Sequence, residues 1–252
     1  MSVETDVKKS RRSSFAETLR VIIHALILAM IVRIFLFQPF NIPSGSMIPT
    51  LLVGDYLFVS KYSYGYSNYS LPFSPDLFSG RIWASPPARG DVAVFKLPRD
   101  NSTDYIKRVI GLPGDEVQMV NGVLHINGKP VKRQRVEDFA TQDSLGNSRK
   151  ILRYKETLPN GVSYQVLDLV ENGFGDNTKV FKVPEAHYFM MGDNRDNSTD
   201  SRVAQAVGFV PVENFVGRAE IIFFSAKPGT TWWEVWRWPT GIRWSRMFRL
   251  VD

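Results

Sequence analysis

The sequence has no cysteine, and its three histidines stand far apart at positions 24, 125 and 187. Without cysteine there is no disulfide, no thiolate nucleophile and no zinc or iron–sulfur site built on cysteine ligands. A close pair such as His-x-x-x-His, which could hold a catalytic metal, is also missing. We therefore expect no metal and no other cofactor.

Negative charge is in deficit, because 25 Asp and Glu face 31 Lys and Arg, which gives a net charge of +6. The basic residues concentrate at the two ends of the chain, beside strongly apolar or aromatic sequence. This distribution is typical of contact with a membrane surface and does not favour nucleic-acid binding. The 252 residues also suffice for a large buried core.

One long apolar run is present, at residues 19–37, and only Arg20, His24 and Arg33 interrupt it. As a helix this run would be about 28 Å long, close to the ~30 Å hydrocarbon core of a bilayer. It predicts a single transmembrane helix, preceded by a tail of residues 1–18. Arg33 lies near the far end, from which a long side chain can reach the interface.

Charge around this run predicts the orientation of the helix. Five Lys or Arg precede Val21, whereas none lies between Arg33 and Lys61. The positive-inside rule then places residues 1–18 in the cytoplasm and everything beyond Phe37 on the outer side of the membrane. A cleavable signal peptide is the alternative, but no small-x-small site follows the run, so we expect an uncleaved anchor.

The sequence beyond residue 37 predicts a mainly β fold, because short runs of alternating β-branched and aromatic residues replace the helical pattern. We expect a core formed by residues 38–112 and 186–225, with residues 62–88 as a long ordered loop. Residues 113–185 are more polar and rich in turn signals, including the hairpin dipeptide Asn121-Gly122. They predict an inserted β subdomain.

Residues 226–252 form a tail that holds five of the six tryptophans, interleaved with Arg237, Arg243, Arg246 and Arg249. Tryptophan and arginine together favour the headgroup layer, which predicts a tail lying on the bilayer surface. The alternative is a basic end packed on the β domain.

The most distinctive segment after the apolar run is residues 41–51, in which Pro43 and Pro49 bracket Ser44, Gly45 and Ser46. The prolines restrict the backbone and Gly45 permits a sharp bend, so Ser46 would be presented on a rigid turn. An ordinary turn explains the same pattern. No histidine stands in a setting suited to a Ser-His-Asp triad.

Lysine can replace histidine as the base if burial lowers its pKa. Lys107 suits this role, because Tyr105 and Val109 share its face of a predicted strand. A solvated lysine on a half-exposed strand is the alternative. A third segment, residues 191–202, is densely polar but does not match an EF-hand. It suggests a solvated turn, or a loop whose hydroxyl binds the lysine and whose Asp/Arg pairs fix its shape.

Together these segments resemble the bacterial type I signal peptidases (leader peptidases), a family of Ser/Lys-dyad serine proteases, over roughly residues 20–225. The matching motifs occur in the family's order: Ser44-Gly45-Ser46-Met47-Ile48-Pro49-Thr50-Leu51, Gly54-Asp55-Tyr56, Arg89-Gly90-Asp91-Val92, Tyr105-Ile106-Lys107-Arg108-Val109-Ile110-Gly111-Leu112-Pro113-Gly114-Asp115, Gly192-Asp193-Asn194-Arg195-Asp196-Asn197-Ser198 with Ser201-Arg202, and Gly208-Phe209-Val210-Pro211. Each motif alone is weak, whereas the collinear set is specific.

The resemblance implies that Ser46 is the nucleophile and Lys107 the general base. It further implies that Ser44 helps to form the oxyanion hole, that Ser198 orients the lysine amine, and that Asp200 and Arg202 form a structural ion pair. The small pockets for the substrate residues at −1 and −3 would be lined by Phe40, Ile42, Met47, Leu51, Tyr105 and Ile106.

The implied activity is removal of signal peptides from exported preproteins at the secretion translocon, by a membrane-bound endopeptidase that cuts after small-x-small motifs. Two features depart from the common family pattern: a single membrane helix, and a longer segment at residues 203–206. The rival hypotheses are a non-catalytic membrane-tethered β module and a Ser/Lys protease that cleaves itself or a regulator in the cytoplasm.

Overall fold

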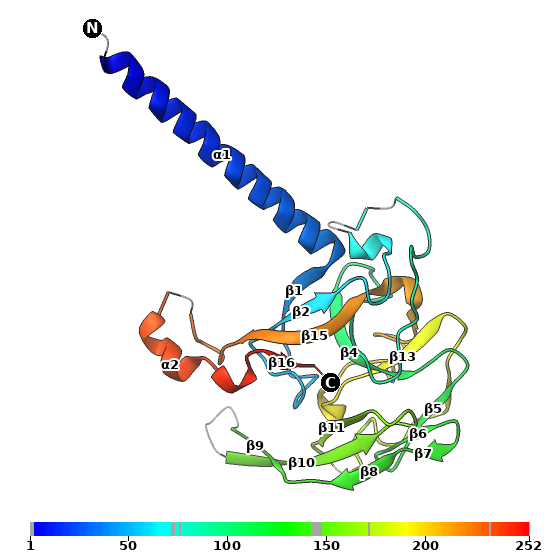
Figure 1. The fold of residues 1–252 in the computed structure, drawn as a ribbon. Coiled ribbons are helices and arrows are strands. Elements are labelled where there is room, and N and C mark those ends of the chain that lie inside the picture. The colour runs from blue at the N-terminus through cyan, green and yellow to red at the C-terminus, as the bar shows by residue number, and fades with distance from the viewer. Residues whose placement is uncertain are drawn as a thin grey trace.

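The computed structural model describes residues 3–71, 74–75, 77–142, 148–170, 172–231 and 233–251, with side chains from residue 15 onward except that of residue 142. Helix α1 (Val3–Phe35) projects from the β body (Figure 1). Its part from Phe15 to Phe35 is the one described helix long and apolar enough to cross a membrane.

The apolar span therefore begins earlier than the predicted 19–37, and Phe37 already belongs to strand β1 (Phe37–Asn41). Pro39 gives the reason for the early end, because a proline disfavours helical backbone angles at the residue before it. The helix consequently ends at Phe35, and the chain becomes extended from Phe37 onward.

The main sheet has eight strands and contains the predicted strands around residues 55, 92, 105, 187 and 219. Its order is β1-β2-β15-β3-β4-β13-β14, and β16 pairs with β15. Besides β1, its members are β2 (Asp55–Ser60), β3 (Val92–Lys96), β4 (Asp104–Gly111), β13 (His187–Met191), β14 (Val210–Pro211), β15 (Phe215–Ser225) and β16 (Arg249–Leu250). The mainly β fold class is confirmed.

Two four-stranded sheets lie between β4 and β13 in the chain and form the lower lobe in Figure 1. One contains β5 (Glu116–Val120), β6 (Val123–Ile126), β7 (Lys129–Pro130) and β12 (Phe181–Lys182). The other contains β8 (Lys132–Arg135), β9 (Phe139–Gln142), β10 (Ser148–Thr157) and β11 (Ser163–Asp168). Asn121 and Gly122 join β5 to β6 with positive φ angles, as the hairpin prediction required.

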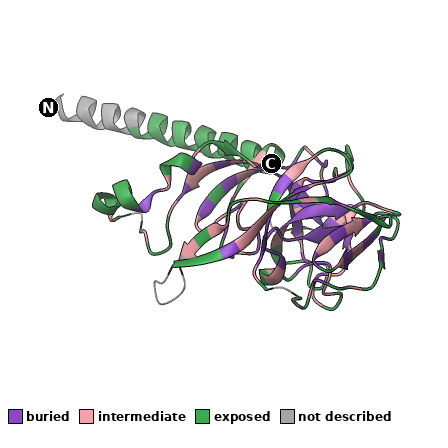
Figure 2. Cartoon of the chain, turned by 90° about the horizontal axis from the view of Figure 1, so that it is seen from below, coloured by how far each residue is buried: buried purple, intermediate pink, exposed green. Residues whose placement is uncertain are grey.

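Buried side chains run through both lobes, whereas α1 is exposed from Phe15 to Arg33 (Figure 2). Ile110 of β4 and Phe189 of β13 share one core cluster with Val117 of β5, Leu124 of β6 and Val166 of β11. Burying an aliphatic or aromatic side chain of this size contributes about 1.5–3 kcal/mol. This shared core attaches the lower lobe to the main sheet beside the loop that follows β13.

The predicted long loop at residues 62–88 is ordered where it is described, and its residues 72, 73 and 76 lie outside the description. It contains the short 3₁₀ helix η1 (Asn68–Ser70) and a bridge between Tyr66 and Ile82. Arg81 donates hydrogen bonds to the carbonyl oxygens of Tyr64 and Gly65 and to three carbonyls of residues 212–215. One guanidinium thus joins the loop to the start of β15.

The remaining short helices are η2 (Arg195–Asn197), η3 (Val212–Asn214), η4 (Val235–Arg237), α2 (Trp238–Gly241) and η5 (Trp244–Arg246). The last three belong to the tail, in which Trp236 and Trp244 are exposed. Arg243 and Arg246 instead form ion pairs with Asp55, whose side chain is fully buried. These two ion pairs agree with the alternative prediction, a basic tail packed on the β domain.

Candidate active site

Ser46 lies in the loop between β1 and β2, and contacts at both ends hold this loop in place. At its base, the Gly54 N–H donates to the Ile42 carbonyl oxygen at 2.9 Å. Near its tip, the Asn194 N–H donates to the Ser46 carbonyl oxygen at 3.0 Å, and the Asn194 side-chain amide donates to Gly45 at 2.9 Å. The bend predicted from the prolines and Gly45 is thus clamped by the polar loop that follows β13.

Lys107 comes from β4, which lies across the sheet from β1, and its amine meets the Ser46 hydroxyl. The Lys107 Nζ to Ser46 Oγ distance is 2.8 Å, and the same amine donates to its neighbour's carbonyl oxygen, that of Ile106, at 2.9 Å. Lys107 is only 4% exposed. Two residues 61 positions apart in the chain are therefore joined, and little of either one is exposed to solvent.

Burial lowers the pKa of Lys107 from its usual 10.5 to about 8, although the charges of Asp200 and Asp193 oppose this shift. The cause is desolvation, which disfavours the charged form of an amine. At a pH near 8 about half of the lysine is neutral, and only the neutral amine can accept a proton. The Ser46–Lys107 pair is thus equipped for nucleophilic catalysis.

The ion pair expected between Asp200 and Arg202 is present and buried. Arg202 Nε donates to Asp200 Oδ1 at 2.9 Å, and the Gly192 N–H donates to Asp200 Oδ2 at 3.0 Å. Burial alone would raise the pKa of Asp200, but the charge and hydrogen bonds of Arg202 hold it below its usual value. Asp200 therefore stays ionised close to the Lys107 amine.

Ser198 lies in the same loop, but its hydroxyl makes no hydrogen bond to Lys107. Its oxygen is buried beside the Asp200 carboxylate, at the margin of hydrogen-bonding geometry, and has no described partner. Its role in orienting the lysine amine stays a prediction. Gly192 permits the close packing here, because a Cβ atom at this position would lie 2.2 Å from Ser198 Oγ and 2.6 Å from the Ser46 carbonyl oxygen.

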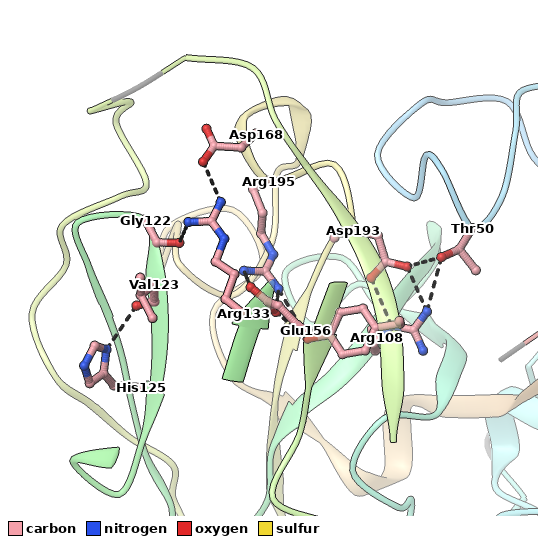
Figure 3. A network of polar contacts seen from close by, with 12 residues as sticks. Thr50, Arg108, Gly122, Val123, His125, Arg133, Glu156, Asp168, Asp193 and Arg195 are labelled. Carbon is pink, nitrogen blue, oxygen red and sulfur yellow. Dashed lines mark hydrogen bonds and ion pairs between the residues drawn. The ribbon is translucent and has the colours of Figure 1, made fainter. Parts of the chain in front are cut away.

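A buried arginine next to Lys107 supports the loop on the other face of β4 (Figure 3). Arg108 is fully buried, and it donates to Asp193 Oδ1 at 3.0 Å and to Asp193 Oδ2 at 2.8 Å. The Thr50 hydroxyl donates to the same carboxylate at 2.5 Å. The loop that carries Ser46, the strand that carries Lys107 and the polar loop therefore meet at one carboxylate.

A second buried pair ties the polar loop to the lower lobe, as Figure 3 also shows. Arg195 donates to Glu156 Oε1 at 3.0 Å and to Glu156 Oε2 at 2.5 Å, and the Tyr164 hydroxyl donates to Glu156 at 2.9 Å. Glu156 lies on β10 and Tyr164 on β11. The lower lobe thus helps to fix the loop on which the Ser46 contacts depend.

A groove of about 490 Å³ opens over Ser46 and Lys107. One wall is β1 with the residues that follow it, and the other is the first half of β4. Its lining consists of Phe40, Asn41, Ile42, Pro43, Ser44, Gly45, Ser46, Val94, Asp104, Tyr105, Ile106, Lys107, Asn197 and Thr199. The Ser44 Oγ to Ser46 Oγ distance is 3.5 Å, so the second hydroxyl points into the same groove.

Comparison with known proteins agrees with this geometry. The family model described as "Signal peptidase, peptidase S26" matches residues 15–224. Proteins named "Signal peptidase I" are similar along nearly the whole chain: that of Rickettsia typhi is 44% identical over 97% of this chain and 96% of its own length, and that of Rickettsia canadensis is 41% identical over 98% and 97%. The chain belongs to the signal peptidase family.

The family resemblance seen in the motifs is thus confirmed, and this chain, as a member of the family, is a hydrolase. Among solved structures, a signal peptidase I of Enterococcus faecalis is 27% identical and covers 53% of this chain and 97% of its own, with a TM-score of 0.32. With a TM-score this low, the assignment rests on the sequence matches.

The groove brings together most, but not all, of the residues predicted to contact substrate. Phe40, Ile42, Tyr105 and Ile106 line it. Met47 and Leu51 do not line it; they are fully buried in the core cluster beneath it. Their apolar side chains follow Ser46 on a loop that turns inward, so these two positions, assigned to the pockets from the family resemblance, lie in the core instead.

Several residues of this signal peptidase site escaped the sequence analysis. Asn197 and Thr199 line the groove, and Arg108 and Asp193 form its central support. Asp/Arg pairing within the polar loop was expected, but the partner of Asp193 lies on β4. Arg108 shares one face of the strand with Ile106 and Ile110. A charged residue on an otherwise apolar face is the signal that could have indicated a buried ion pair.

The described carboxylates that come nearest to a metal site are Asp168, Asp176 and Asp196, whose oxygens lie within 4.8 Å of one another. Each already accepts a hydrogen bond from the protein: Asp168 from Arg133 at 2.6 Å, Asp176 from a backbone N–H at 2.7 Å, and Asp196 from another at 2.7 Å. These donors offset part of the repulsion among the three carboxylates, although burial, and the charges of Asp168 and Asp196, still raise the pKa of Asp176.

Proposed function

We propose that the chain is a membrane-anchored serine endopeptidase that removes signal peptides from exported preproteins, with Ser46 as nucleophile and Lys107 as general base. The observation that carries this proposal is the buried 2.8 Å contact between the Lys107 amine and the Ser46 hydroxyl. Kinship with proteins named signal peptidase I supports the substrate class.

In the proposed reaction, neutral Lys107 takes the proton from Ser46 Oγ as this oxygen attacks the scissile carbonyl carbon. The Ser46 N–H, which has no acceptor among the described residues, and the Ser44 hydroxyl would donate to the resulting oxyanion. Protonated Lys107 then passes its proton to the leaving amine, and the peptide bond breaks to leave an acyl-enzyme. A water molecule, deprotonated by Lys107, hydrolyses the ester and restores both groups.

The two walls of the groove favour a substrate in extended conformation. Strand β1 is the first strand of the sheet and pairs only with β2. In β4, residues 104–107 pair with β3 on one side, whereas the described pairs with β13 begin at Arg108. Both walls therefore offer unpaired backbone to a peptide that adds as a strand.

Such a strand would place alternate side chains on the groove's floor, because side chains i and i+2 of a strand face the same way. Phe40, Ile42 and Ile106 narrow the space there. Small residues at −1 and −3 fit this geometry, so the proposed cleavage follows small-x-small motifs.

The apolar span of α1 and the charge distribution support the proposed location. With residues 1–18 in the cytoplasm, the groove lies on the far side of the inner membrane, where α1 ends at Phe35 and β1 begins two residues later. A preprotein leaving the translocon would present its cleavage site at this level, while its apolar segment remains in the bilayer.

The test is cleavage of a preprotein by the purified full chain and three variants. Ser46→Ala and Lys107→Ala should each abolish cleavage, whereas Ser44→Ala should keep the dyad and lose about 100-fold in kcat, or ~3 kcal/mol, as for one oxyanion donor. Circular dichroism checks that each variant is folded. Cleavage retained by both dyad variants would exclude the mechanism and leave a binding module as the better hypothesis.

A further inference from the structure

A second cavity, of about 580 Å³, lies where the end of α1 meets the main sheet, at the helix–sheet junction seen in Figure 1. Its wall on the helix side includes Leu26, Met30 and Ile34, which are apolar. Three cationic side chains also line it: Arg33 from the last turn of the same helix, and Lys61 and Lys96 from the β body. The substrate groove contains none of these residues.

The cations of this cavity outnumber the acids that face it. Lys96 pairs with Asp104 at 2.9 Å, but no described carboxylate forms a salt bridge with Arg33 or Lys61. Three cations and one carboxylate leave a net charge of +2, since 3 − 1 = 2. Lys61 is buried, Lys96 is half-buried and Arg33 is exposed. Excess positive charge around a buried amine is unfavourable, so the cavity favours binding of an anion.

Lys61 illustrates this imbalance. It is 1% exposed, and its amine donates to the Ser70 carbonyl oxygen, which is neutral. Burial, and next the nearby charge of Arg33, lower the pKa of Lys61 to about 8, although the charge of Asp104 opposes this shift. An anion placed between the two cations would offset their repulsion and part of the cost of burying the Lys61 amine.

The arrangement of charge and apolar surface follows the axis of α1. Arg33 lies in the last turn of the helix, and Leu26 precedes it by seven residues, which is about 10 Å along the axis. Leu26 and Met30 are 63% and 61% exposed, so the apolar wall continues onto the open surface of the helix. A ligand for this cavity needs an anionic head at the end of the helix and an apolar chain beside it.

We propose that this cavity binds one anionic phospholipid from the outer leaflet, with the phosphate between Arg33, Lys61 and Lys96 and an acyl chain along Leu26 and Met30. The inference rests on the proposed membrane span of α1, which puts the cations at headgroup depth and the apolar wall in the hydrocarbon layer. Free phosphate would match the cations but leave the apolar wall without a partner.

The site adjoins the substrate groove. Asp104 lines both cavities, and it is the carboxylate that pairs with Lys96. A bound phosphate would compete with Asp104 for Lys96. Asp104 is the first residue of β4, the strand that carries Lys107. The lipid would therefore lie beside the entry of the groove and complete the wall between membrane and active site.

The experiment uses the full chain with Ser46→Ala, so that no proteolysis occurs. The chain is placed in three kinds of nanodisc: phosphatidylglycerol alone, phosphatidylcholine alone, and a mixture of the two. Native mass spectrometry counts the lipids that stay bound after release from the nanodisc. We expect one retained phosphatidylglycerol per chain, and affinity about tenfold lower in Arg33→Gln and in Lys96→Gln, as for the loss of one ion pair. Arg33→Lys keeps the charge and should restore binding.

The matched control is Arg99→Gln, because Arg99 is exposed and outside the cavity, and this variant should retain lipid like the parent chain. Equal retention of phosphatidylcholine, unchanged binding in both cavity variants, or displacement of the lipid by inorganic phosphate alone would overturn the proposal. A chain that fails to insert into nanodiscs refutes the membrane span and with it the lipid site. Insertion without selective retention refutes the lipid site only and leaves the protease proposal standing.

Discussion

At the scale of single residues, the candidate site depends on how completely Lys107 is removed from water. The motif around residues 105–110 indicated a lysine beside apolar neighbours, and that part could be read from alternation along one strand. The burial itself could not, because it comes from Ser46 on one loop and from the loop after β13. The position of Ser198 relative to the Lys107 amine depends in the same way on how the loop after β13 packs, which the sequence does not reveal.

Because only neutral Lys107 can act as base, kcat/KM should rise with pH and level off above the pKa, which lies at about 8. Well below that value, the neutral fraction falls tenfold for each unit of pH, so the slope of log kcat/KM should approach 1. The measurement is the pH profile of cleavage of a peptide that spans a signal-peptide cleavage site. A profile already flat at pH 6 would contradict a lysine base.

The stability of the fold gives an independent check on the same group. Lys107 titrates at a lower pH in the folded chain than its usual 10.5, so the unfolded state binds more protons between about pH 8 and 10.5. The contribution of Lys107 to stability is therefore unfavourable below about pH 8 and is relieved as the pH rises through that window. Lys107→Met should remove this rise from the pH dependence of the unfolding free energy.

At the scale of elements, the strands were predictable and their long-range supports were not. Short runs rich in β-branched and aromatic residues indicated β2, β4 and β13, and the structure buries both faces of β13 and of the second half of β4. The tail was read as an interfacial segment because tryptophan and arginine alternate there. Only tertiary structure reveals that Arg246 reaches Asp55, whose side chain also accepts from Ser225 at 2.6 Å.

Arg246 is expected to support the loop that carries Ser46. It pairs with the buried Asp55 carboxylate and donates to the Thr50 carbonyl oxygen at 2.9 Å. Arg246→Gln removes the nearer of two cationic partners of Asp55 and leaves Arg243 at 3.7 Å. Breaking a buried pair completely costs about 3–5 kcal/mol, so we expect a loss toward the lower end of that range. Urea unfolding monitored by tryptophan fluorescence should show that loss, and preprotein cleavage should fall with it.

Arg249→Gln is the matched control, since Arg249 belongs to the same tail but is exposed. It should unfold within about 0.5 kcal/mol of the parent chain, as is usual for surface substitutions. An Arg246→Gln chain as stable as this control would show that the tail does not hold the Ser46 loop, and would return the whole tail to the bilayer-surface hypothesis.

At the scale of the whole molecule, the function requires the groove and the substrate to be on the same side of the membrane. The order of the segments was predictable, because hydropathy marks the helix and turn signals mark the β lobes. The shared core of Ile110, Phe189 and Leu124 was not, since its members come from three distant strands. Through that core and the Glu156–Arg195 ion pair, the lower lobe supports the candidate site.

The last prediction concerns orientation. Alkaline phosphatase, which folds to an active form only outside the cytoplasm, should be active when fused after residue 252. Replacing Lys8, Lys9, Arg11 and Arg12 by glutamine removes four of the five positive charges that precede Val21 and should lower that activity, because the charge difference across the helix sets its orientation. Replacing Lys227, Arg237 and Arg249 should not, since they lie far from the helix in the chain. A phosphatase inactive in the parent fusion would put the groove in the cytoplasm. A preprotein already crossing the membrane cannot present its cleavage site there. A cytoplasmic Ser/Lys protease would then be the better explanation of the Ser46–Lys107 pair.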